Sequence, residues 1–166
     1  MLADASTPRV NVVSTHSFVD SEHARNRATR RSQTGVLLFF NRTPILWYSK
    51  KQNTFDTSTF SSEFIALKTA TELVEDLRYK LRVFGIPIEG PTNIFCDNES
   101  VYKNMSTPEL TLKNNNVSIS YHKCREDVAT RVARIAKEGT ATNLADMFTK
   151  MLVQIRRENM LDKFKH

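Results

Sequence analysis

Hydrophobic positions divide the N-terminal part of the chain into three segments that are typical of β-strands. Apolar and polar residues alternate over Val10–Asp20, and this period of two predicts a strand with one buried face. Thr34–Asn41 is almost continuously apolar, and Pro44–Ser49 follows it closely, so each predicts a further strand. Because the links between the segments are short, we expect the three strands to pair antiparallel.

A long helix is predicted after the third strand. Ser58 has a side chain that commonly caps helix N-termini, and Gly85 with Pro87 ends the segment. Apolar residues recur at helical spacing between these limits, at Phe60, Phe64, Leu67, Val74, Leu77, Leu81 and Phe84. A helix with this spacing buries one stripe of side chains, so we expect it to pack on the sheet.

The rest of the chain alternates strands and helices. In order, we expect a strand over Thr92–Cys96, a helix over Asn98–Met105, a polar loop over Ser106–Asn116, a helix over Val117–Thr130, a strand over Arg131–Ala136, a helix over Thr142–Leu152 and a basic, weakly amphipathic segment over Val153–His166. Strands that follow long helices favour crossovers to parallel neighbours. We therefore expect an α/β fold with a five-stranded mixed sheet, three antiparallel strands and then two parallel ones, flanked by helices. Several nuclease and non-nuclease folds share this order.

Composition agrees with one globular domain. The 166 residues are 40% hydrophobic and 25% charged, which are ordinary values. We expect a single domain over 1–166, with a core at about 10–152 and a basic C-terminal extension at 153–166. The formal charge of +6 favours an acidic partner such as nucleic acid, although many basic proteins bind none.

The cysteines and the N-terminal sequence bear on the compartment. Cys96 and Cys124 lack C-x-x-C spacing, so the sequence suggests neither a zinc site nor a disulfide framework. Met1–Val10 lacks the apolar core of a signal peptide, and no apolar run approaches the length of a membrane span. We therefore expect an intracellular protein.

Four carboxylates lie at the ends or on the packed faces of the expected elements. They are Asp20 at the end of the first strand, Glu63 on the apolar stripe of the long helix, Asp97 directly after a parallel strand and Asp146 early in the last helix. Each also has a simpler interpretation, as a turn residue, a helix cap or a charge favoured near a helix N-terminus. If the sheet brings them to one edge, converging carboxylates would suit Mg²⁺ or Mn²⁺. Two such ions about 4 Å apart stabilise the oxygens that attack and leave in phosphodiester cleavage.

Seven short motifs give a more specific indication. They are VDSEHA at 19–24, TRRSQTG at 29–35, PILWYSKKQNT at 44–54, SSEFIAL at 61–67, IFCDNES at 94–100, YHKCRE at 121–126 and NLADMFTK at 143–150. In this order and spacing they resemble the ribonuclease H region of copia-type LTR retrotransposon polyproteins, over about Val10 to Leu152.

The resemblance implies a fold, an activity and a site. It implies the ribonuclease H fold and a metal-dependent endonuclease that cuts the RNA strand of RNA–DNA hybrids during reverse transcription. The residues that match the family's catalytic and metal-binding carboxylates are Asp20, Glu63, Asp97 and Asp146. The resemblance further implies two Mg²⁺ ions, for which Mn²⁺ can substitute, and products with 5′-phosphate and 3′-hydroxyl ends. The implied partners are the reverse transcriptase and integrase parts of the same polyprotein, in a cytoplasmic virus-like particle or the nucleus.

A hybrid-binding surface needs cations for phosphates and groups that sense 2′-hydroxyls. Asn98 and Ser100, beside Asp97, are candidates for contacts in the minor groove, although roles as helix-cap residues are equally expected. The candidates for phosphate contacts are Arg30, Arg31, Lys50, Lys51, Lys123 and Arg125. Each of these could instead be an ordinary solvated surface charge.

The chain departs from the family pattern in several places. Asp20 is followed by Ser-Glu where family members often have Ala-Asp, Asn116 stands where His is common, and Met151 stands where Pro is usual. The loop at 137–140 also lacks a histidine that cellular ribonucleases H carry. These departures support a second hypothesis, a catalytically weak or inactive hybrid-binding or scaffolding domain. A third, a DDE integrase or transposase, is disfavoured by the position of Glu63 on the first helix.

Overall fold

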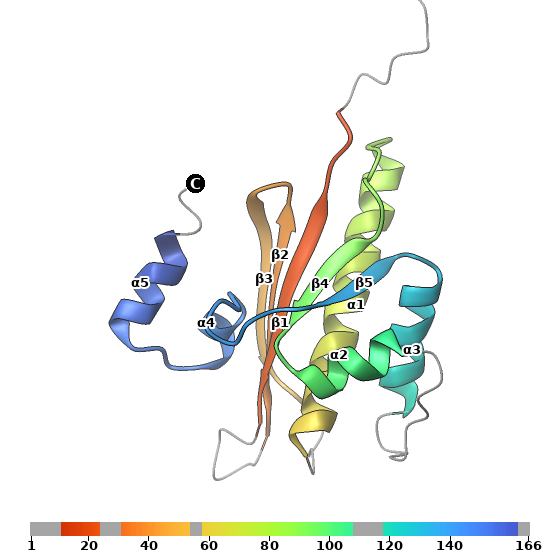
Figure 1. Cartoon of the computed structure of the whole chain (residues 1–166). Helices are drawn as coiled ribbons and strands as arrows, with labels where there is room; N and C mark the ends of the chain where they lie inside the picture. Colours follow the sequence, from red (N-terminus) through yellow and green to blue (C-terminus); the bar gives the residue numbers. More distant parts are fainter. Residues whose placement is uncertain (1–10, 24–30, 54–57, 108–117, 163–166) are drawn as a thin grey trace, which may run out of the picture.

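The computed structural model describes residues 11–23, 31–53, 58–107 and 118–162, which form a five-stranded sheet with helices on both faces (Figure 1). The strands are β1 (Thr15–Glu22), β2 (Gln33–Phe40), β3 (Thr43–Lys51), β4 (Thr92–Cys96) and β5 (Ala133–Lys137). Their order is β3-β2-β1-β4-β5, in which β1, β2 and β3 pair antiparallel and β4 and β5 run parallel to β1. The mixed sheet expected from the hydrophobic pattern is therefore confirmed.

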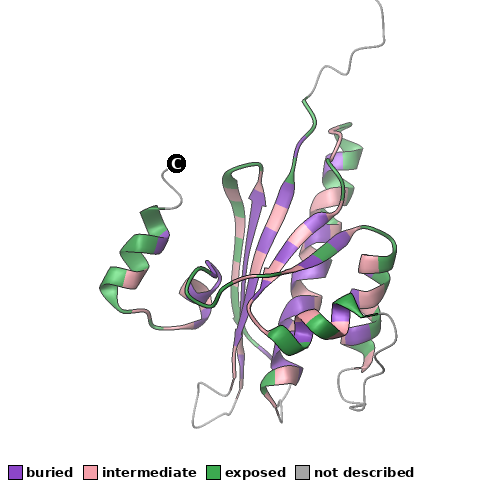
Figure 2. Ribbon diagram, in the orientation of Figure 1, coloured by how far each residue is buried: buried purple, intermediate pink, exposed green. Residues whose placement is uncertain are grey.

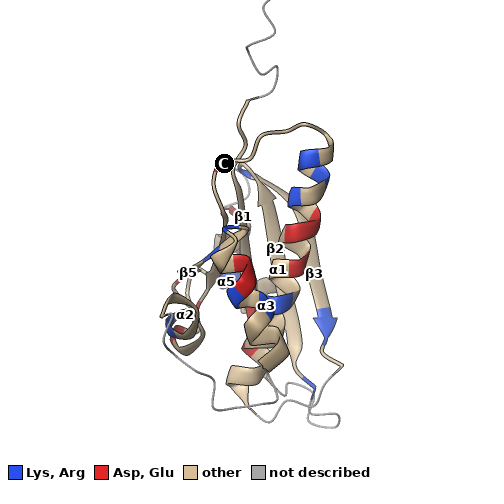
Figure 3. Cartoon of the chain, turned by 90° about the vertical axis from the view of Figure 1, so that its right-hand side faces the viewer, with Lys and Arg blue, Asp and Glu red and all other residues tan. Residues whose placement is uncertain are grey.

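The helices of the described residues are α1 (Thr59–Val83), α2 (Glu99–Ser106), α3 (Ser118–Ala129), α4 (Asp146–Thr149) and α5 (Gln154–Asp162). Ser58 caps α1 as predicted, because its hydroxyl oxygen accepts a hydrogen bond from the Ser61 backbone N–H at 3.2 Å. Lys80 and Arg82 lie in the last turn of α1, where their charges suit the helix dipole, and Figure 3 shows basic residues at this end of the helix. None of these helices is both long and apolar enough to cross a membrane.

Alternation along the central strands sends side chains into two cores on opposite faces of the sheet. Val36 of β2 packs with Val19 of β1 in the larger core, which α1, α2 and α3 cover. Leu37 and Phe39 of β2 pack on the other face with Met160 of α5. Since β2 contributes to both cores, it is buried along nearly its whole length (Figure 2). This explains why its sequence is almost continuously apolar rather than alternating.

The helix predicted over Thr142–Leu152 is wrong for most of its length. Only the single turn Asp146–Thr149 is helical, and the Asn143 side chain before it makes other contacts. Its buried amide donates to a backbone carbonyl of β1 at 2.9 Å, and its oxygen accepts from the Ala145 backbone N–H at 3.1 Å. Lys150 then ends the turn with an extended backbone. Most of the loop predicted over 106–116 lies outside the described residues.

Gly35 of β2 is a point of close approach between the sheet and the α4 segment. A Cβ at this position would lie 2.7 Å from the Thr149 methyl group and 2.9 Å from the Ala145 carbonyl oxygen. Contacts this short do not occur at real Cβ atoms, so the absence of a side chain lets α4 pack against the strand. Because Gly35 pairs with Asp20 of β1, this contact also fixes how close α4 lies to that carboxylate.

Gly35→Ala should therefore lower the free energy of unfolding by about 1–3 kcal/mol, the usual cost of overpacking. Urea denaturation of both proteins would measure this cost. Gly139→Ala is a matched control, because its Cβ would meet only the Thr142 hydroxyl at 3.1 Å. Equal unfolding midpoints for the two variants would contradict the argument.

Candidate active site

Carboxylates from two parallel strands meet at one edge of the sheet. β1 runs as far as Glu22, so Asp20 lies inside this strand rather than closing it. The register of β1 with β4 pairs Phe18 with Phe95. Asp20 lies two residues after Phe18, and Asp97 lies two residues after Phe95, directly after the end of β4. The parallel pairing therefore brings together two residues that are distant in the sequence.

Glu63 reaches the same place from the second turn of α1. This residue is 7% exposed, so the structure favours the interpretation in which its side chain faces the sheet. It disfavours the alternative, in which the carboxylate is solvated and interacts with the helix dipole. One carboxylate oxygen from each of Asp20, Glu63 and Asp97 lies within 4.8 Å of the other two. Oxygens gathered at such distances form the kind of donor set that hard divalent cations prefer.

A buried amide fixes the start of α1 relative to the sheet. The Gln52 side chain, just after β3, donates to the Thr34 hydroxyl of β2 and to the Ser62 backbone carbonyl, each at 2.9 Å. The Gln52 backbone N–H donates to the Ser32 carbonyl at 2.8 Å. These hydrogen bonds hold the residue before Glu63 against two strands, and they therefore limit how far this carboxylate moves away from the cluster.

Burial and mutual repulsion disfavour the ionised carboxylates in the absence of a cation. Burial raises the pKa of Glu63 well above its ordinary value, and the charges of Asp20 and Asp97 raise it further. Burial also raises the pKa of Asp97, and the charge of Asp20 adds to the effect. A positive ion bound among these groups would relieve both penalties.

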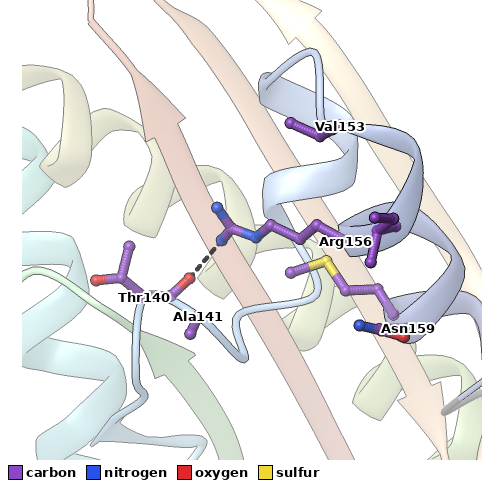
Figure 4. Close-up of a pocket in the computed structure, with 7 residues that line it drawn as sticks. Thr140, Ala141, Val153, Arg156 and Asn159 are labelled. Carbon is purple, nitrogen blue, oxygen red and sulfur yellow. Dashed lines mark hydrogen bonds between the residues drawn. The ribbon is translucent and has the colours of Figure 1, made fainter.

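Asp146 is joined to this cluster through basic side chains. It is fully buried in α4, and Lys150 Nζ lies 2.7 Å from its Oδ1 and 3.3 Å from Asp20 Oδ1. Arg156 of α5 pairs with Asp146 Oδ2 and donates to the Thr140 carbonyl at 2.6 Å (Figure 4). Burial alone would lower the pKa of Lys150, but its hydrogen bond to Asp146 and the charge of Asp20 raise that pKa overall. The fourth predicted carboxylate therefore lies near Asp20, with Lys150 between the two, but outside the group of three whose oxygens lie within 4.8 Å of one another.

Sequence reasoning missed the residues that organise the Asp146 side of the site. Lys150 had a usable signal, since it lies four residues after Asp146, a spacing at which ion pairs form on helices. Asn143 also had one, because asparagine side chains commonly bond to nearby backbone and disfavour helix interiors. Arg156 had no local signal, because it approaches from a different helix.

The candidates for nucleic-acid contact near the cluster differ in their surroundings. Lys50 and Lys51 are exposed at the end of β3, where Figure 3 shows a basic strand end. Ser100 is also exposed. The Asn98 side-chain oxygen accepts hydrogen bonds from two backbone N–H groups and so caps α2, in agreement with the simpler interpretation. Contacts of these four residues with a hybrid stay predictions.

The remaining basic candidates have other surroundings. Lys123 forms ion pairs with one carboxylate of α1 at 2.6 Å and one of α3 at 2.9 Å, which tie these helices together. Arg125 donates to two carbonyl groups at the end of α2. Both side chains therefore have structural roles, and their contacts with nucleic acid stay predictions. Arg31 is half-buried, and Arg30 lies outside the described residues.

The raised pKa of Glu63 predicts how stability depends on pH. Between its ordinary pKa of 4.5 and the higher folded value, the folded state binds more protons than the unfolded state. The free energy of unfolding should therefore fall as pH rises through this interval. The fall is about 1.4 kcal/mol for each unit by which the pKa of Glu63 in the folded state exceeds its ordinary value. Urea denaturation in EDTA from pH 4 upward, at roughly half-unit steps, would measure the slope.

Glu63→Gln removes the titrating group, so its stability should decline less steeply than that of the wild type. Glu72→Gln is the control, because Glu72 lies on the same helix with a half-exposed side chain. If Glu63→Gln kept the wild-type slope, the carboxylate would not carry the electrostatic penalty described above.

Relatives with similar sequences come from plant transposons. No protein-family model matches the chain. It is 26% identical over 153 residues to the retrovirus-related Pol polyprotein from transposon RE1 of Arabidopsis thaliana, and 29% identical over 136 residues to that from transposon TNT 1-94 of Nicotiana tabacum. These alignments cover 92% and 81% of the chain but 10% of each relative. The chain thus spans about a tenth of the length of the curated relatives that it matches.

Solved structures with a similar architecture include ribonucleases H. The N-terminal ribonuclease H domain of a Mycobacterium tuberculosis protein matches with a TM-score of 0.63 at 13% identity, over 92% of this chain and 97% of that one. Ribonuclease H1 of Halobacterium salinarum matches with a TM-score of 0.61 at 17% identity, over 90% and 98%. A ribonuclease H1 in complex with an RNA/DNA hybrid matches with a TM-score of 0.62 at 16% identity, over 82% and 93%. The chain has the ribonuclease H fold and is a homologue of the retrovirus-related Pol polyproteins of plant transposons, as its motifs predicted.

Proposed function

We propose that this chain is a metal-dependent endonuclease that hydrolyses the RNA strand of RNA–DNA hybrids during retrotransposon reverse transcription. The observation that carries the proposal is the convergence of Asp20, Glu63 and Asp97 within 4.8 Å, with Asp146 beside them. This cluster lies on a fold shared with ribonucleases H, one of which was solved with an RNA/DNA hybrid bound. Hybrid is therefore the substrate that the proposal assigns to the chain.

The chemistry of the donor set fits Mg²⁺. The three converging groups are all carboxylates, and hard cations with oxygen ligands are favoured there over softer metals. Raised pKa values at Glu63 and Asp97 indicate negative charge that the protein's own cations do not balance fully. The proposed ligands of two Mg²⁺ ions, for which Mn²⁺ can substitute, are Asp20, Glu63, Asp97 and Asp146. When bound, such ions supply positive charge to the attacking and leaving oxygens of phosphodiester hydrolysis.

The chain's own residues orient the substrate around this cluster. Lys50 and Lys51 present exposed ammonium groups that suit phosphate contacts on one side. Ser100 is exposed at the N-terminal end of α2, close in sequence to Asp97, and its hydroxyl suits contact with a 2′-hydroxyl. In this proposal Asn98 positions Ser100 indirectly, since its side chain caps the helix that carries it.

The proposed setting is a longer polyprotein. The relatives are Pol polyproteins about ten times the length of the matched region. We infer that the reverse transcriptase and integrase parts of such a polyprotein are the partners of this chain. Reverse transcription produces RNA–DNA hybrids, so a hydrolase of this specificity would act on its product within the same intracellular particle.

Cleavage of a labelled RNA–DNA hybrid in Mg²⁺ and in EDTA would test the activity. Asp97→Asn should lower the rate at least 100-fold, because even residues that only support metal ligands contribute roughly 10–100-fold. Asp76→Asn is the matched control, since Asp76 is an exposed residue of α1 that pairs with Lys80. Both Asp76→Asn and the wild type should cut only in Mg²⁺.

Two outcomes would contradict the proposal. Equal cleavage in Mg²⁺ and EDTA would exclude metal-dependent hydrolysis. Tight hybrid binding by the wild type without cleavage would instead support a non-catalytic binding or scaffolding domain.

A further inference from the structure

The carboxylates of the candidate site are not balanced evenly by basic side chains. Both oxygens of Asp146 are engaged, one by Lys150 and the other by Arg156, and Lys150 also reaches Asp20. Among the described residues, no Lys or Arg lies within ion-pair distance of Glu63 or Asp97. Within the described part of the chain, the positive charge in direct contact with the cluster is thus concentrated on the Asp146 side.

The side chains of Lys150 and Arg156 differ in the contacts that hold them in place. The Lys150 ammonium is a point charge on a flexible stem, and its side-chain partners within the described ranges are the two carboxylates alone. Arg156 is also bonded to the Thr140 carbonyl, toward which it extends from α5 (Figure 4). That helix is anchored by Met160, which is 2% exposed in the smaller core. Of the two cations, Lys150 is therefore the one that can leave with less disruption.

We propose that Lys150 is a built-in counterion that holds the place of a divalent cation between Asp20 and Asp146. A first cation would bind to Asp20, Glu63 and Asp97, where no Lys or Arg of the described residues pairs with Glu63 or Asp97. A second cation binds at Asp146 only in exchange for the Lys150 ammonium. The inference rests on the metal site of the proposed function, but it does not depend on cleavage.

The exchange follows from simple electrostatics. A cation held by Asp20 and Asp146 would need carboxylate oxygens that Lys150 Nζ contacts. At the separation that those oxygens allow, the ammonium and the cation would also repel each other strongly in a partly buried place. The counterion in turn keeps Asp146, which is fully buried, from being an uncompensated charge when no metal is bound.

Titration of the metal-free chain with Mn²⁺, followed by electron paramagnetic resonance without nucleic acid, would test the exchange. We expect the wild type to bind one ion tightly and a second at least tenfold more weakly. Lys150→Met should tighten the second binding event at least tenfold. Lys68→Met is the matched control, because Lys68 also pairs with a carboxylate four residues away but lies outside the cluster. Identical affinities for the second ion in Lys150→Met and the wild type would overturn the inference.

A measurement on the wild-type protein avoids any loss of folding in the variant. Reductive methylation, read out for each lysine by mass spectrometry, reports whether an ammonium group is engaged. Lys150 should react slowly in EDTA and several-fold faster in saturating Mg²⁺, while Lys68 should react equally in both. Unchanged reactivity of Lys150 would refute the exchange even if the hybrid were cleaved. Conversely, if metal released Lys150 but no hybrid were cut, the result would contradict the proposed function and support the exchange of Lys150 for a cation.

Discussion

Crowded and buried negative charge is the constraint on which the rest of this molecule depends. Asp20 and Glu63 are less than a tenth exposed, and their oxygens lie within 4.8 Å of each other and of Asp97. Apolar packing cannot remove the free-energy cost of burying these charges, because an ionised carboxylate needs water, a hydrogen-bond donor or a cation. The chain meets it in two ways. Raised pKa values favour protonation at Glu63 and Asp97, and Lys150 supplies positive charge at Asp20.

The scaffold has to resist the repulsion that this arrangement creates. Each of the three converging carboxylates comes from a regular element or its end, and rigid elements hold side chains more accurately than loops do. The Gln52 amide links the start of α1 to β2, and the Asn143 amide links the α4 segment to β1. Both amides are buried, where hydrogen bonds are costly to lose. Local hydrogen bonding thus offsets an electrostatic force that would otherwise spread the site apart.

The sequence predicted the sheet well, because the sheet follows from short-range patterns. The four carboxylates were assigned to one site mainly by the resemblance of the motifs, since each carboxylate alone also fitted a turn, cap or helix-dipole role. Alternation and helical spacing identify β1 to β5 and α1, and a residue just after a parallel strand, such as Asp97, lies at a sheet edge by construction. Asp146 was among the predicted carboxylates, but the residues that position it were not predicted. The position of Asp146 depends on the close packing of α4 against Gly35 and on the ion pair with Arg156 of α5. Periodic patterns in the sequence do not predict contacts between such distant segments. The roles of Lys123 and Arg125 were equally hidden, since charge alone does not distinguish a phosphate contact from an internal ion pair.

The shortness of α4 makes the C-terminal segment part of the site. A single helical turn does not stabilise itself, because helix nucleation costs more than one hydrogen bond returns. The turn that carries Asp146 must therefore be held from outside. β2 contacts it at Gly35, and α5 contacts it through Arg156 while Met160 keeps that helix on the sheet. By composition, residues 153–162 resemble an extension outside the domain. In the structure, however, Arg156 from this segment pairs with Asp146, and the buried Met160 holds α5 on the sheet. Any partner that lifted α5 from the sheet would consequently alter the charge around Asp146 without touching the other three carboxylates.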